Sequence, residues 1–267
     1  MKFDLSFQKV KALFINICFF MNLHAIAQSK GTLYLSWGYN REAYSRSTLH
    51  LKNTITDNYD FKVHRVYAHD KSNFEAIGPI NALTIPQYNL HIGYWFKKKP
   101  NTGLELSWDH LKYVVSDNQI VKVTGNIKGR YINKDTLVDP NFMHVQHTNG
   151  NNYLMFNYMK RLPLWRNKTF ELFWQNKLGA GVLYSFTIST VLGNYDPGYF
   201  KIQGYVLGVN SGIQLNIFKH FFLQTDAQGA FAHYINSDLG ADHVGKLNHV
   251  FLSGAMSLQF GFNVPIK

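Results

Sequence analysis

Cysteine is nearly absent from the chain, since Cys18 is the only one among 267 residues. It falls within a short apolar stretch near the N-terminus, so the chain beyond that stretch has no disulfide and no thiol chemistry. Proline is scarce too, with 7 residues against 20 glycines. After residue 27 no run approaches about 18 uninterrupted apolar residues, which excludes a transmembrane helix there. Aromatic residues are abundant, at 16%, and this composition favours an all-β fold.

The first 27 residues have the features of a secretory signal peptide. Lys2, Lys9 and Lys11 make a basic start, and the stretch from Leu13 to Leu23 is almost entirely apolar. Ala25-Ile26-Ala27 then provides the small-x-small pattern of a cleavage site. About a dozen apolar residues are too few to cross about 30 Å of hydrocarbon. We therefore expect a signal peptide at residues 1–27 and one domain of about 240 residues at 28–267.

The chain is basic, which bears on its partners. Its formal net charge is +11, and loss of three lysines and one aspartate with the signal peptide leaves +9. A positive net charge of this size often indicates that the binding partner is a nucleic acid or an anionic surface. A secreted chain does not meet DNA or RNA, so we expect no nucleic acid partner and favour membrane lipids with anionic head groups.

Alternation of apolar and polar residues is the main structural signal. Between Gly103 and Tyr113, one face carries leucines and a tryptophan, while the other carries Glu105, Ser107 and Asp109. A period of two is the geometry of a β-strand, because successive side chains point to opposite faces. The eight strand candidates are Thr32–Arg41, Pro86–Phe96, Gly103–Val115, Asn152–Leu162, Thr169–Thr187, Lys201–Phe218, His220–Ile235 and Asn248–Val264.

The length of these segments separates a membrane barrel from a soluble sandwich. Ordinary strands have about 5–6 residues, whereas a tilted strand that crosses a bilayer needs about 9–11. An open sheet edge in lipid would leave backbone groups without hydrogen bonds, so the sheet must close. The sequence thus predicts a closed antiparallel transmembrane β-barrel, with lipid outside and polar side chains inside. We expect Leu90, Trp108, Leu207 and Leu258 to line the lipid side.

Connection lengths predict the topology. Short connections at Lys97–Thr102, Pro163–Lys168 and Lys219 alternate with long ones at Glu42–Ile85, Ser116–Asn151, Ile188–Phe200 and Asn236–Leu247. Short periplasmic turns and long outer loops are typical of outer-membrane barrels. Within the first long loop, Thr48–Lys52 and Tyr59–Ala68 also have strand character. We read them as a projecting hairpin beside eight wall strands; the alternative is ten wall strands, with a periplasmic turn within Lys71–Thr84.

The last strand carries a family resemblance. The segment from Ser257 to Val264 resembles the closing strand of Gram-negative outer-membrane barrels, which the barrel assembly machinery recognises, although the chain ends in Pro265-Ile266-Lys267 rather than in an aromatic residue. The chain as a whole resembles the family of small eight-stranded outer-membrane β-barrels. The resemblance implies a location in the cell outer membrane, with phospholipids and lipopolysaccharide as partners. It implies little about activity.

Charged residues on the predicted inner face form the first candidate site. They are His91, Glu105, Asp109, Arg161, Glu171, Lys177 and Asp226. Buried charges must be paired, and an eight-stranded lumen is narrow enough to be filled by side chains. We therefore expect a salt-bridged, hydrogen-bonded plug in which Arg161 and Glu171, on either side of one turn, can meet. The leading function is then a non-enzymatic barrel whose outer loops support the envelope or bind a surface ligand; a small pore is one alternative.

A second alternative is a lipid A or phospholipid acyl hydrolase at the outer leaflet. His147-Thr148-Asn149-Gly150 resembles the end of the motif that such enzymes carry, and Ser237 lies on another outer loop. In those enzymes a histidine lies two residues before a nucleophilic serine. Here Gln146 lies two residues before Thr148, and no serine is present. A hydrolase needs its nucleophile within hydrogen-bond reach of the base. We expect His147 at the outer rim, with no hydroxyl within about 3 Å.

Metal binding is a weaker candidate. His144 and His147 are three residues apart, which suits a helix better than a strand, and nothing nearby completes a ligand set. The sequence therefore predicts no metal and no cofactor.

Overall fold

The computed structural model describes residues 31–71 and 87–266, and these residues form an antiparallel all-β fold. The predicted signal peptide, with Cys18, lies outside the described residues, as does most of Lys71–Thr84. Eight strands are long: β1 (Gly31–Tyr44), β5 (Tyr88–Phe96), β6 (Lys99–Val115), β9 (Met143–Arg166), β10 (Phe170–Phe186), β13 (Phe200–Ile217), β14 (Phe221–Leu239) and β15 (Gly245–Ile266). The other seven lie in the connections between these strands and have at most nine residues, the length of β5: β2 (Ser47–Asn53), β3 (Tyr59–Val66), β4 (Ala68–His69), β7 (Gln119–Ile127), β8 (Arg130–Val138), β11 (Ile188–Val191) and β12 (Asn194–Asp196). Within the two described ranges, no helix is long and apolar enough to cross a membrane.

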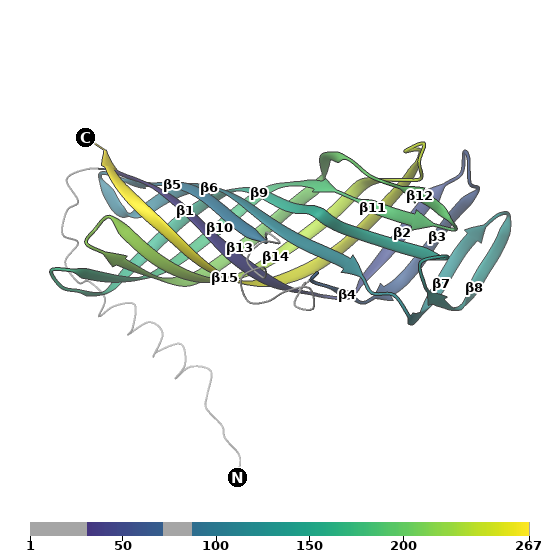
Figure 1. Cartoon of the computed structure of the whole chain (residues 1–267), viewed down its shortest axis with the longest axis horizontal. Helices are drawn as coiled ribbons and strands as arrows, with labels where there is room; N and C mark the ends of the chain where they lie inside the picture. Colours follow the sequence, from purple (N-terminus) through teal and green to yellow (C-terminus); the bar gives the residue numbers. More distant parts are fainter. Residues whose placement is uncertain (1–30, 72–86, 267) are drawn as a thin grey trace, which may run out of the picture.

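The long strands pair in the order in which they occur along the chain. Their order is β1-β5-β6-β9-β10-β13-β14-β15, and β1 also pairs with β15 from Gly31↔Ile266 to Tyr44↔Ser253. Each long strand therefore has a long antiparallel neighbour on both sides. The strands run side by side at a slant to the long axis of the molecule (Figure 1). The described part of each of the eight predicted wall segments lies mainly in a strand, and the prediction of an all-β antiparallel fold is confirmed.

Side-chain directions follow the predicted period of two. Leu90 and Trp108 are each 37% exposed on the outer surface of the ring, and Leu207 and Leu258 are 50% and 64% exposed. Their sequence neighbours His91, Asp109 and Gln259 are buried inside. The predicted register is therefore confirmed at these positions.

The described parts of the long connections contain strands. Ser116–Asn151, predicted as a loop, holds the hairpin β7–β8 and the first part of β9, which begins at Met143 and not at Asn152. Hairpin β2–β3 contains the two segments predicted to project, except that Ala68 lies in β4, which pairs with β6. The hairpin joins β15 through three residue pairs, Lys246–Asn248 with Lys52–His50. We call the end of the ring that carries the hairpins the outer end. The hairpins lie at the right end in Figure 1.

A hydrophobic core explains why these connections are ordered. Alternate residues of β2, β3 and β7 are buried, including Leu49, Phe61 and Val123, and they pack with Val145 of β9. Strands β2, β3 and β7 thus bury one face, which a short connection of polar residues does not do, whereas Val138 is the one buried residue of β8. The opposite end of the ring has turns of two or three residues, at 97–98, 167–169 and 218–220.

Candidate functional site

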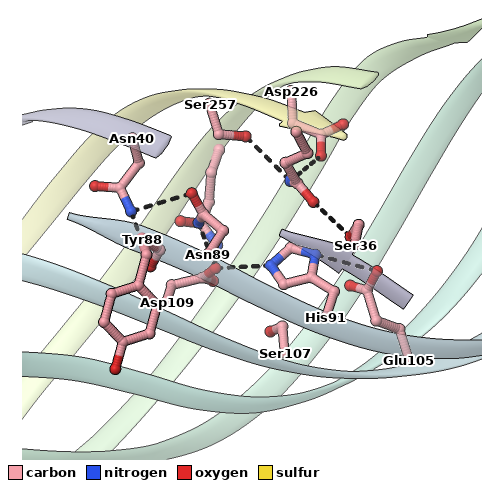
Figure 2. A network of polar contacts seen from close by, with 12 residues as sticks. Ser36, Asn40, Tyr88, Asn89, His91, Glu105, Ser107, Asp109, Asp226 and Ser257 are labelled. Carbon is pink, nitrogen blue, oxygen red and sulfur yellow. Dashed lines mark hydrogen bonds and ion pairs between the residues drawn. The ribbon is translucent and has the colours of Figure 1, made fainter. Parts of the chain in front are cut away.

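Charged side chains of β5, β6, β10 and β14 form a buried network on the inner faces of these strands, and Figure 2 shows His91, Glu105, Asp109 and Asp226 within it. Lys177 of β10 is at its centre. Its Nζ lies 2.7 Å from Oε2 of Glu105 and 3.7 Å from Oδ2 of Asp226, and the side chains are 1%, 1% and 4% exposed. Burial strengthens this attraction, because little water screens it.

His91 extends the network towards the outer end. Its Nε2 lies 2.7 Å from Oδ1 of Asp109, and its Nδ1 lies 3.3 Å from Oε2 of Glu105. Figure 2 shows the imidazole between these two carboxylates. An imidazole with a proton on both nitrogens satisfies both contacts. Asn89 also donates to Asp109, from Nδ2 at 2.5 Å.

Neutral side chains complete the coordination of the carboxylates. Tyr34 donates its hydroxyl to Glu105, and Asn157 Nδ2 donates to the other oxygen of Glu105 at 3.0 Å. Gln224 and Gln259 donate to Oδ2 of Asp226 at 2.6 and 3.2 Å. Buried polar groups are costly unless they are hydrogen-bonded, and these contacts satisfy both oxygens of Glu105 and Oδ2 of Asp226.

Little free space remains beside these side chains. A cavity of about 10 Å³ is lined by side chains that include Asn40, His91, Asp109, Asp226 and Gln259. That volume holds about one water molecule. Oδ1 of Asp226 has no hydrogen-bond partner among the described residues, and a water in this cavity would supply one.

Arg161 and Glu171 do not pair in the predicted way. Glu171 makes its ion pair with Arg166, whose Nε lies 2.6 Å from Oε1. The guanidinium carbon of Arg161 instead lies between two rings, 4.3 Å from the Trp95 centroid and 4.4 Å from that of Phe173. The register explains the difference, because Glu171 is opposite Arg166 whereas Arg161 is opposite Gln175. Glu171 thus belongs to the rim of the ring rather than to the central network.

The prediction for His147 is wrong. His147 is fully buried beneath the outer end, and its Nδ1 lies 2.7 Å from Oγ1 of Thr187. Its Nε2 faces Nε2 of His249 at 3.1 Å, and its ring stacks on Tyr234 with centroids 4.1 Å apart. His147 precedes the predicted wall segment Asn152–Leu162, and burial, followed by the repulsion of His249, lowers its pKa well below the ordinary range.

The hydrogen bonds assign proton positions in this histidine pair. Thr187 donates its hydroxyl to Oε1 of Gln203 at 2.6 Å, so it accepts from Nδ1–H of His147. Nε2 of His147 then accepts from Nε2–H of His249. A hydrolytic pair has the opposite direction, since its hydroxyl donates to the imidazole. The contact is therefore a structural hydrogen bond as it stands.

The other predicted hydrolase residues are not brought to His147. Thr148 donates its hydroxyl to Oε1 of Gln146 at 3.1 Å, and the hydroxyl of Ser237 is buried with no hydrogen-bond partner in the described part of the chain. His144 points away from His147 and contacts Oδ1 of Asp117 at 3.0 Å. Across residues 31–71 and 87–266, no group of three or more His, Cys, Asp or Glu residues is placed to hold a metal ion.

Thr187 and His249 are the residues that the sequence did not indicate. They are 40 and 102 positions from His147. Their contact depends on the register of strands that are distant in the chain, and neither residue lies in a recognisable motif.

No protein-family model matches the chain, and no curated protein matches it either. Among solved structures, it is similar to the attachment invasion locus protein Ail of Yersinia pestis in complex with the heparin analogue sucrose octasulfate, at 10% identity and a TM-score of 0.32, over 88% of this chain and 99% of that one. Outer membrane protein OprG from Pseudomonas aeruginosa has 9% identity and a TM-score of 0.35, over 89% and 97%. Neisserial surface protein A has 7% and 0.33, over 87% and 96%. These similar structures are outer-membrane β-barrels.

Proposed function

We propose that the chain is an outer-membrane protein whose eight long strands form a closed transmembrane barrel with a plugged polar lumen. Its role is structural, or it binds a surface ligand through the strands at its outer end. A signal peptide at residues 1–27 directs its export, and the barrel assembly machinery inserts it by way of the closing strand. Lipopolysaccharide and phospholipids then surround the wall.

The observation that carries this proposal is the reversal of polarity across the wall. On β6, Glu105 is 1% exposed inside the ring, whereas the adjacent Leu106 is 49% exposed outside. The outer surface repeats this pattern with Phe156, Leu178 and Phe260, exposed by 57%, 63% and 52%. Contact of this outer surface with water would destabilise the fold, because the exposed apolar area far exceeds that of a soluble monomer. Contact with lipid stabilises the fold.

The network around Lys177 supports the plug. Side chains from β1, β5, β6, β10 and β14 cross the lumen and contact one another, and the adjoining cavity holds about one water. Ion conduction needs a continuous row of waters, for which this section has no space. We therefore favour the plugged barrel over the small pore.

Conductance in a planar lipid bilayer tests this function. Residues 28–267, folded into vesicles and fused with the bilayer, should give no large, stable single-channel currents. A variant with Lys177→Ala, Glu105→Ala and Asp226→Ala empties the centre of the lumen, and it should raise the frequency of openings. Large, stable currents from the wild-type protein would make the pore the better account.

A lipid acyl hydrolase is the second candidate, because a histidine and a hydroxyl are within hydrogen-bond distance at His147 and Thr187. Both are buried, so a substrate would first have to open the outer end. Mass spectrometry of lipids from a deletion strain tests this alternative. A set of lipids that gains one acyl chain in the absence of the protein, and loses it on complementation, would favour the enzyme.

A further inference from the structure

Positive charge is concentrated at the end of the ring that carries the short turns (left in Figure 1). Seven exposed basic side chains lie there, and we call them the basic rim: Lys97, Lys98, Lys99, Lys160, Arg166, Lys168 and Lys219. They come from all three turns and from the strands beside them. Among the described residues at this end, Glu171 is the only carboxylate, and it pairs with Arg166.

The opposite end does not share this imbalance. Its exposed lysines lie among aspartates, as Lys52 does beside Asp60 at 3.1 Å, and Lys122 opposite Asp135. Seven cations facing one carboxylate thus distinguish the basic rim from the rest of the surface. Unscreened like charges repel one another, so this end favours an anionic partner.

Aromatic side chains fix the depth of the basic rim. Trp165 precedes Arg166, and Phe218 precedes Lys219; they are 52% and 63% exposed. Phe221, two residues after Lys219, is 49% exposed. Exposed aromatic residues at the end of a transmembrane wall lie at the level of the lipid head groups.

The turns keep the cations at that depth. A turn of two or three residues spans at most about 10 Å even when extended, and these turns fold back on themselves. The ammonium groups therefore stay beside the head groups and do not extend far into the aqueous compartment. This geometry favours lipid phosphates as the anionic partner of these ammonium groups. An anionic polymer that lies away from the bilayer would be out of their reach.

We propose that the basic rim binds the phosphate groups of anionic phospholipids in the leaflet at the short-turn end. The inference rests on the proposed function, which places this end in the periplasmic leaflet. Each lysine beside an anionic membrane surface favours an anionic lipid over a zwitterionic one. Anionic phospholipids are then enriched among the lipids that surround the basic rim.

Lipid retention by the whole mature chain tests the inference. The protein is inserted into bilayers of equimolar phosphatidylcholine and phosphatidylglycerol, extracted in mild detergent, and the lipids that remain bound are counted by native mass spectrometry. Wild-type protein should retain phosphatidylglycerol over phosphatidylcholine by at least about threefold. The variant with Lys97→Gln, Lys98→Gln, Lys168→Gln and Lys219→Gln should retain the two lipids nearly equally.

A matched variant at the other end controls for total charge. Lys62→Gln, Lys122→Gln, Lys128→Gln and Lys134→Gln remove the same number of exposed lysines and should keep the wild-type selectivity. Equal selectivity in wild-type protein and the rim variant, or equal loss in both variants, would overturn the inference. So would phosphatidylglycerol retention that inorganic phosphate abolishes at matched ionic strength, or binding to purified cell wall without lipid selectivity.

Insertion is measured first, in pure phosphatidylcholine, by resistance of the folded band to unfolding in gel electrophoresis. Failure at this step contradicts the proposed function. Insertion without lipid selectivity contradicts the basic rim alone.

Discussion

Nζ of Lys177 lies 2.7 Å from Oε2 of Glu105, and the two side chains, each 1% exposed, join β10 to β6 across the interior of the ring. Those strands are not neighbours in the sheet, since β9 lies between them. The ion pair therefore links parts of the wall that no backbone hydrogen bond joins.

Replacement of Lys177 by methionine should destabilise the protein strongly. It leaves Asp226 buried without its cation and Glu105 with His91 alone, and removal of one partner of a buried ion pair costs about 3–5 kcal/mol. Urea unfolding in vesicles, followed by tryptophan fluorescence, measures the loss. Lys122→Met, at an exposed position, should change stability by less than about 0.5 kcal/mol. Addition of Glu105→Gln should recover part of the loss, and equal effects of Lys177→Met and Lys122→Met would show that the pair contributes little.

His147 should make stability fall in mild acid. Its pKa is lowered in the folded protein, whereas an unfolded histidine titrates near about 6.5. The unfolded state therefore binds the extra proton first, and stability is lost as pH falls below about 6.5. The slope from one such group is about 1.4 kcal/mol per pH unit. Urea midpoints between neutral pH and pH 5 should depend less on pH in His147→Gln than in wild-type protein, and parallel curves would contradict this assignment.

Two glycines on the wall should respond oppositely to alanine. A Cβ at Gly212 would overlap the side chain of Asp226 and the carbonyl oxygen of Thr225, whereas a Cβ at Gly254 meets no atom within 4 Å. Gly212→Ala should therefore destabilise the barrel by about 1–3 kcal/mol through overpacking. Gly254→Ala should be neutral within about 0.5 kcal/mol. The same unfolding assay compares them, and similar values for both would refute the close approach at Gly212.

The wall was predictable because its evidence is local. On β6, the neighbours Glu105 and Leu106 have opposite polarity, and that alternation assigns each side chain to a face. Charged residues such as Lys177 and Asp226 could be placed inside by the same reasoning. The alternation predicts which charged residues lie inside but not which of them pair. Glu171, for example, pairs with Arg166 and not with Arg161.

The outer end was less predictable, because contacts there join distant segments. The burial of His147 against Thr187 and His249 depends on the packing of β9 with strands far along the chain. Hairpin β7–β8 has little strand pattern in the sequence, since its solvent face mixes lysine, asparagine and aspartate. The alternation of Val121 and Val123 on β7 was the available signal.

Contact with lipid or water along the strands is the most direct test of a closed membrane barrel. Residues 28–267 contain no cysteine, so single cysteines can carry a nitroxide label without further changes. In vesicles, labels at Leu90→Cys, Leu207→Cys and Leu258→Cys should collide with oxygen, which concentrates in lipid. Labels at Ser36→Cys, Ser107→Cys and Ser257→Cys should be shielded from oxygen. We predict this alternation of oxygen collision, with a period of two residues, on both sides of the β1–β15 pairing. Equal oxygen collision at the leucine and serine positions, or contact with water at the leucine positions, would contradict it.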